Sequence, residues 1–207
     1  MAIATKNQFW NARMTGVNPA KPGGNSNDSW SGSGGSTVND SWVITNGTWS
    51  ITPAADENDL TVVACFEYTT APSDDAVLLT LANGSHRVDV KSDGTAAGLK
   101  VVGDTTATFS DLDMSLTDTE SVPIIIRLTL SSAGVAKCYR YEIIENDDAA
   151  NDFISLNASS SSDNTVSWGN GSGNVTWHSV YYSKYGAFDP RELMTSDFAQ
   201  DIHIRMA

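Results

Sequence analysis

Short runs in which apolar and polar residues alternate recur along most of the chain from Trp42 onward. In the clearest run, residues 124–130, aliphatic side chains occupy the even positions, and Ile125, Arg127 and Thr129 occupy the odd ones. A period of two predicts a strand with one buried face. The turn sequence at 131–134 leads into a second alternating run. There we expect Tyr139 and Tyr141 on one face, and Cys138 and Arg140 on the other.

Further strands are predicted from the same rhythm at 42–45, 48–52, 60–68, 76–82, 86–91, 99–102, 105–109, 165–168 and 175–182. The dipeptides Asn46-Gly47 and Asn83-Gly84 each predict a tight hairpin, because both residue types tolerate positive φ. Only the tail carries a helix signal, with Asp189 as a potential N-cap before Pro190. The pattern therefore predicts an all-β fold, an antiparallel β-sandwich or jelly roll with a short C-terminal helix.

Residues 1–39 differ from the rest, being rich in Gly, Ser and Pro and poor in aliphatic side chains. This composition predicts an extended N-terminal arm in front of a β-sandwich domain at 40–207. The segment also contains Phe9, Trp10 and Trp30. Large aromatic residues in an otherwise coil-like segment suggest anchors that dock on the domain or on a neighbouring subunit.

Two segments carry a family resemblance. One is the hairpin at 124–144, and the other is the strand Val175–Tyr182, followed by a loop and the helix signal at 186–193. Both resemble the concanavalin A-like lectin/glucanase superfamily, which includes laminin-G-like domains. The resemblance implies two stacked, curved sheets with a concave face that often binds sugar. It implies no particular activity, because this fold supports many functions.

The charge balance limits the partners. Twelve basic and twenty-five acidic residues give a net charge of −13, which disfavours nucleic acid and anionic membranes as partners. The sequence contains no run of about eighteen apolar residues, which a membrane helix would require. Its first residues lack the apolar core of a signal peptide. We therefore expect synthesis in a host cytoplasm. Cys65 and Cys138 lie in predicted strands, where we expect buried thiols, although the sequence leaves a disulfide open.

No catalytic motif is present, so we predict that the protein is not an enzyme. Glucanases of the superfamily carry closely spaced acidic residues on one strand, and this sequence has no such run. The nearest acidic cluster is Asp111, Asp113, Asp118 and Glu120. It is interpreted either as a solvated loop or as a calcium site, since carboxylate oxygens are the ligands that calcium prefers. No other cofactor is expected.

Tryptophan residues are the remaining candidates for function. Sugar-binding sites stack pyranose rings on aromatic faces, and five tryptophans are candidates for this role: Trp10, Trp30, Trp42, Trp49 and Trp168. The alternative for each is packing within the sandwich, which is the common role of Trp in such folds.

Two functions follow from these features. The first is a phage structural protein, a capsid decoration or fibre-like component on the virion surface. Its partners would be a major capsid or other virion protein and further copies of itself, with a trimer as our expectation. The absent export signal, the lack of catalytic motifs, the β-rich composition and the arm suggest this role. The alternative is a carbohydrate-binding, lectin-like module, and a virion protein that binds host glycans would combine the two.

Overall fold

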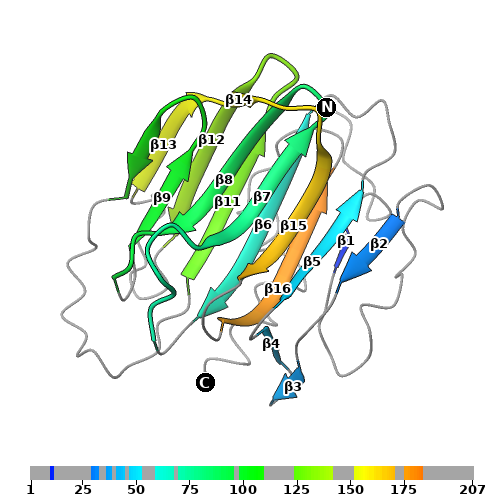
Figure 1. Ribbon diagram of the computed structural model, residues 1–207, viewed down its shortest axis with the longest axis vertical. Helices are drawn as coiled ribbons and strands as arrows, with labels where there is room; N and C mark the ends of the chain where they lie inside the picture. Colours follow the sequence, from blue (N-terminus) through cyan, green and yellow to red (C-terminus); the bar gives the residue numbers. More distant parts are fainter. Residues whose placement is uncertain are drawn as a thin grey trace.

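The chain forms two antiparallel β-sheets (Figure 1), and burial alternates along many of their strands. The computed structural model describes residues 10–11, 29–32, 36–38, 41–44, 47–52, 59–67, 70–95, 98–109, 124–141, 152–170 and 175–183. Within these ranges the regular elements are all strands, and no helix is long and apolar enough to cross a membrane. The predicted antiparallel β-sandwich is therefore confirmed, whereas the predicted C-terminal helix lies outside the described residues.

Sheet A has the order β13-β12-β11-β6-β16-β4-β3, and β1 also pairs with β16. Its strands are β1 (Trp10–Asn11), β3 (Ser36–Val38), β4 (Ser41–Ile44), β6 (Leu60–Glu67), β11 (Ile124–Leu130), β12 (Val135–Tyr141), β13 (Asp152–Asn157) and β16 (Val175–Ser183).

Sheet B has the order β10-β9-β8-β7-β15-β5-β2, and β14 also pairs with β8. Its strands are β2 (Ser29–Gly32), β5 (Gly47–Thr52), β7 (Val77–Asn83), β8 (His86–Ser92), β9 (Leu99–Val102), β10 (Thr106–Thr108), β14 (Ser159–Ser160) and β15 (Asn164–Asn170).

The core lies between the inner faces of the two sheets. In sheet A the even-numbered positions of β11 are buried, and in register with them lie Val62 on β6 and Cys138 on β12. In sheet B, Leu81, Val88 and Val166 are fully buried. Each such aliphatic side chain stabilises the fold by about 1.5–3 kcal/mol. The alternation predicted for β11 and for Cys138 to Arg140 is confirmed, because residues 124, 126, 128 and 130 are buried, and because Cys138 and Arg140 are buried whereas Tyr139 is half-buried.

Strand β6 is buried on both of its faces. Val62 and Ala64 belong to the inner core, whereas Val63 and Cys65 pair with Arg127 and Ile125 on the outer face. Val63 is nevertheless 0% exposed and Cys65 is 2% exposed. A strand buried on both faces requires a continuous apolar run rather than an alternating one. The segment at 62–66 supplies such a run.

Two of the predicted hairpins are confirmed and one is wrong. Strands β7 and β8 pair across the Asn83-Gly84 turn, in which Gly84 has a φ of 84°. Strands β11 and β12 pair across 131–134, in which Gly134 has a φ of 77°. Strands β4 and β5, predicted to pair across Asn46-Gly47, instead pair with β16 of sheet A and β15 of sheet B. A local turn preference does not determine which distant strand becomes the hydrogen-bonding neighbour.

The segment predicted as an arm contributes strands to both sheets. Strand β1 pairs with β16, β3 pairs with β4, and β2 pairs with β5. This differs from an arm that stays extended in front of the domain. A second difference is β13, which lies between residues 144 and 165, where no strand was predicted.

Candidate binding surface

Of the five candidate tryptophans, Trp168 is the one whose side chain is described. It is 1% exposed and belongs to the core between the sheets. A sugar cannot stack on a ring that is buried in this way, so the binding role predicted for Trp168 is wrong and the alternative, core packing, holds. Trp177, which was not a candidate, is also buried, and its ring lies 4.8 Å from that of Phe66.

For the other four tryptophans the structure describes the backbone alone. Their pairings are Trp10 with Tyr182, Trp30 with Ile51, Trp42 with Trp177, and Trp49 with Trp168. All four therefore lie in strands of the sandwich. Whether any of them contacts a sugar stays a prediction.

The predicted calcium ligands Asp111, Asp113, Asp118 and Glu120 lie outside the described residues. Among the residues that the structure does describe, no group of three or more His, Cys, Asp or Glu side chains is placed to hold a metal ion. The calcium site accordingly stays a prediction.

An aromatic row crosses the outer face of sheet A near its edge. It consists of Arg127, Tyr139 and Phe153, which are direct register partners on β11, β12 and β13. Register partners on adjacent strands have side chains on the same face of the sheet, about 5 Å apart. The row extends inward to Val63 on β6.

The three side chains of the aromatic row stack on one another. The guanidinium carbon of Arg127 lies 3.9 Å from the centre of the Tyr139 ring, a cation–π contact. The Tyr139 and Phe153 ring centres are 4.7 Å apart, with an angle of 36° between the ring planes. Both distances fall within the range of favourable stacking. The Tyr139 ring is therefore held between Arg127 and Phe153, and it restricts the motion of the Phe153 ring.

Exposure rises along this row from the middle of the sheet to its edge. Val63 is buried, Arg127 and Tyr139 are half-buried, and Phe153 is 51% exposed. Strand β13 is the last strand of sheet A. One side of the Phe153 ring is covered by Tyr139, and no described strand of sheet A lies beyond its other side. Phe153 thus presents an apolar ring surface to solvent at the edge of the sheet.

A polar row lies beside the aromatic row on the same face. It is formed by Thr129, Lys137 and Ser155, which are again register partners on β11, β12 and β13. Lys137 and Ser155 are exposed, and Thr129 is 9% exposed. Rows two residues apart along a strand are separated by about 7 Å. A ligand of the size of one sugar ring on Phe153 would reach the ammonium and hydroxyl groups of this row.

The outer face of sheet B has a different character. There Thr80, Arg87, Asp89 and Asp163 form a network of mutual hydrogen bonds, called here the sheet B network. The Thr80 hydroxyl donates to Asp89 at 2.6 Å, and the Arg87 Nε donates to both oxygens of Asp89 at 3.1 and 3.2 Å. A second nitrogen of Arg87 donates to Asp163 at 3.0 Å. Burial disfavours the charge of Arg87, but hydrogen bonds and attraction from the two carboxylates outweigh it and raise the pKa of the guanidinium.

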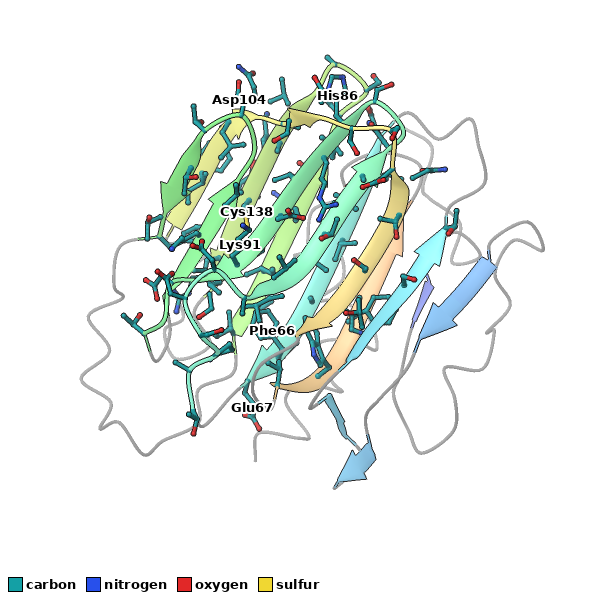
Figure 2. The ribbon with its side chains drawn as sticks, in the orientation of Figure 1. Phe66, Glu67, His86, Lys91, Asp104 and Cys138 are labelled. Atoms are coloured by element: carbon teal, nitrogen blue, oxygen red, sulfur yellow. The ribbon has the colours of Figure 1, made fainter. Side chains whose placement is uncertain are left out.

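The two ends of the sandwich contain further polar side chains. Figure 2 shows His86 and Asp104 at one end and Glu67 at the opposite end. The His86 ring packs on Gly134, where an added Cβ would lie 2.6 Å from the ring. Toward the other end, Lys100 forms ion pairs with Asp74 and Asp75. These contacts join neighbouring loops and strands to one another, which is a structural role.

Both cysteines are buried thiols that form no disulfide with each other, as expected for lone cysteines in strands. Burial raises the pKa of the Cys138 thiol to about 12, and the charges of Arg140 and Arg127 offset only part of that rise. A thiol with such a pKa stays protonated at neutral pH and is a poor nucleophile.

Sequence reasoning missed Phe153 because no strand was predicted between residues 144 and 165. The signal was present, since Ile154 and Leu156 alternate with Phe153, Ser155 and Asn157. In the structure Leu156 is buried and the odd positions are exposed. This alternating run is short, and its aromatic residue, Phe153, lies on the outer face of the strand rather than on the core face.

Similar folds occur among solved structures. No family profile matches the sequence, and no curated protein matches it. The sialidase of Trypanosoma rangeli in complex with sialic acid is similar with a TM-score of 0.54 and 13% identity, over 83% of this chain and 30% of that chain. The binding domain of botulinum neurotoxin serotype C1 is similar with a TM-score of 0.53 and 10% identity, over 84% of this chain and 47% of that chain.

These likenesses show the fold alone. The chain spans less than half the length of either structure, and the sequence identities are low. A Griffonia simplicifolia lectin, I-B4 in its metal-free form, has a TM-score of 0.47 and 10% identity over 84% of this chain and 98% of the lectin chain.

Proposed function

We propose that this protein is a non-enzymatic, lectin-like binding domain that binds glycans through the aromatic row and the polar row beside it. The observation that carries this proposal is the half-exposed ring of Phe153, stacked on Tyr139 at the edge of sheet A. Among the described residues the only other exposed large hydrophobic side chain is Val77. Aromatic side chains are enriched among the residues that contribute most to binding.

The geometry suits a sugar. The apolar face of a pyranose ring packs against an aromatic ring, and its hydroxyl groups need hydrogen-bonding partners at the rim. Phe153 supplies the ring, and Ser155 and Lys137 supply a hydroxyl and an ammonium on the same face. Because Tyr139 already restricts Phe153, little side-chain entropy is lost when a ligand binds.

The comparisons support a binding role without assigning one. A domain of this fold occurs in a neurotoxin binding domain and in a sialidase solved with sialic acid. A role for this chain rests on its own residues, because the likeness extends to the fold and not to identified site residues.

The proposal is tested by a glycan array followed by calorimetry on the best ligands, with wild type, Phe153→Ala and Val77→Ala. The Val77 variant is the matched control, an exposed hydrophobic residue of sheet B that is truncated to the same side chain. We expect a loss of affinity of roughly tenfold for Phe153→Ala, since an aromatic stacking contact contributes about 0.5–1.5 kcal/mol beyond its buried area. We expect no change for Val77→Ala. Absence of binding at millimolar sugar, or equal binding by both variants, would contradict the proposal.

The role on a virion surface, with a capsid protein as partner and a trimeric assembly, stays a prediction. Deleting residues 1–38 would remove β1, β2 and β3, which the segment predicted as an arm contributes to the two sheets. Deleting residues 1–9 is the cleaner test, because it leaves all described strands in place. If residues 1–9 mediate docking on a particle, the shortened protein stays folded and no longer occupies the particle. Normal occupancy by the shortened protein would contradict docking through this segment.

A further inference from the structure

We infer that the sugar bound at the aromatic row is anionic, carrying a carboxylate or a sulfate group that Lys137 binds. This inference rests on the proposed glycan-binding function and narrows its ligand class. The chain has a net charge of −13. Yet the two charged side chains described in the aromatic and polar rows, Arg127 and Lys137, are both cations.

Lys137 is the more accessible of the two cations. It is exposed, lies two residues from Tyr139 on β12, and is the register partner of Ser155 on β13. The structure gives it no ion pair among the described residues. Its four-carbon stem allows the ammonium to reach the group bound next to Phe153.

Arg127 adds to the positive potential at this position. Its guanidinium lies over Tyr139 and is only half-exposed, so it acts on a ligand mainly through its field. The described acidic residues on the same face are Asp59 and Glu67. Glu67 lies at the far end of β6, six residues from the row of Lys137, and the Asp59 carboxylate accepts a hydrogen bond from the Ser132 amide at 2.6 Å. Strand spacing places Asp59 roughly 12 Å from Lys137, two strands and one row away. That distance exceeds the screening length of about 8–10 Å, so Asp59 does not neutralise Lys137.

Two cations of sheet B, in contrast, form ion pairs with carboxylates. Arg87 is paired with Asp89 and Asp163, and Lys100 is paired with Asp74 and Asp75. Lys91 is the exception, since it lies on the outer face of sheet B with no described ion pair. Its register partners are Val77 and Lys100, and neither is aromatic. Lys91 therefore provides a matched control, a cation of the same type without a stacking surface.

The experiment titrates three ligands into the full-length protein: a neutral oligosaccharide, the same oligosaccharide ending in a uronic acid, and its sulfated form. Wild type should bind at least one acidic ligand about three- to tenfold more tightly than the neutral one. That range combines a solvent-exposed ion pair with a stacking contact that orients it. Lys137→Gln should abolish the preference, because the affinity for the acidic sugar should fall further than the affinity for the neutral one. Lys91→Gln should keep the preference.

The outcomes separate the two proposals. Equal binding of neutral and acidic sugars by wild type overturns the anionic ligand and leaves glycan binding standing. If Lys91→Gln loses the preference for acidic sugars and Lys137→Gln keeps it, the anion does not bind at Lys137. No binding of any of the three sugars, nor of any glycan on the array, overturns glycan binding itself. Because Lys137 is exposed and Lys91 forms no described ion pair, both variants should melt near the wild-type temperature, which verifies that they are folded.

Discussion

The outer faces of the two sheets differ in how far their polar groups are hydrogen-bonded or ion-paired and in how far their apolar side chains are covered. On sheet B, the network of Thr80, Arg87, Asp89 and Asp163 pairs its donors with its own acceptors. On sheet A, β6 is buried on both sides, and the face opens toward β13 onto the half-exposed Phe153 and onto Lys137, which forms no ion pair with another described residue. A face that satisfies its own groups gains little from a ligand, because each new bond replaces an existing one. The edge of sheet A has groups that a ligand would satisfy for the first time.

The largest expected effect comes from placing a polar amide at the centre of each outer face. Val63→Asn introduces the amide at a position that is 0% exposed, whereas Ser167→Asn introduces it at a half-exposed position of sheet B. We expect the first change to lower the free energy of unfolding by roughly 3 kcal/mol, and the second by about 0.5 kcal/mol or less. Urea denaturation measures both. Similar small losses would show that the outer face of sheet A is open at β6.

The reactivity of the two thiols tests whether both faces of sheet A are buried at these positions. Cys138 lies on the inner face of sheet A, and Cys65 on the outer face, and both are buried. We expect neither to react with a thiol reagent in the folded protein, and both to react once urea unfolds it. Burial also raises the pKa of Cys138 to about 12, so raising the pH to 9 should not activate it. Fast modification of Cys65 alone would place that side chain in solvent.

On sheet B the sharpest test is removal of the central acceptor. Asp89→Ala leaves Thr80, which is 2% exposed, without its acceptor, although Arg87 keeps its bond to Asp163. We expect a loss of about 1–2 kcal/mol of unfolding free energy and no change in sugar affinity. Asp163→Ala is the control, since that side chain is 51% exposed and its pair should contribute under about 1 kcal/mol. A large loss of sugar affinity in Asp89→Ala would move the binding surface to sheet B.

The smallest effect concerns the ion pair at the end of sheet B. The hydrogen bond from Lys100 holds the pKa of Asp74 below its ordinary value of 3.8. A carboxylate with a lowered folded pKa stabilises the fold above its unfolded pKa, and this contribution is lost as the pH falls through the folded pKa. In Lys100→Met the pKa of Asp74 should rise toward the ordinary value, which an NMR titration of the carboxyl carbon measures. An unchanged pKa would show that Lys100 does not bind Asp74 in solution.

Much of the fold could be predicted from local pattern because the strands of the core obey it. The alternation in β11 predicted its buried face correctly, and the unbroken apolar run around Val63 is the signature of a strand buried on both sides. Pairing was harder to predict. Whether β4 joins β5 or β16 depends on contacts between distant segments, which a turn dipeptide does not determine.

The candidate site was predicted in the wrong place for a related reason. Trp168 is large and lies near Asn and Gly, but its position on the inner side of β15 buries it. Phe153 is exposed because β13 is the last strand of its sheet, and being an edge strand is a property of the assembled topology. Residue type marked the aromatic candidates, whereas the strand order determines which ring meets solvent.

The most direct test of the account is an amide NMR titration of the full chain with the acidic sugar that binds most tightly. Binding at the edge of sheet A predicts that the largest shift changes fall on Tyr139, Phe153 and their neighbours Lys137 and Ser155, with those of Thr80, Arg87 and Asp89 unchanged. Largest changes on the sheet B network, with the β12 and β13 amides unmoved, would contradict the aromatic row as the binding surface.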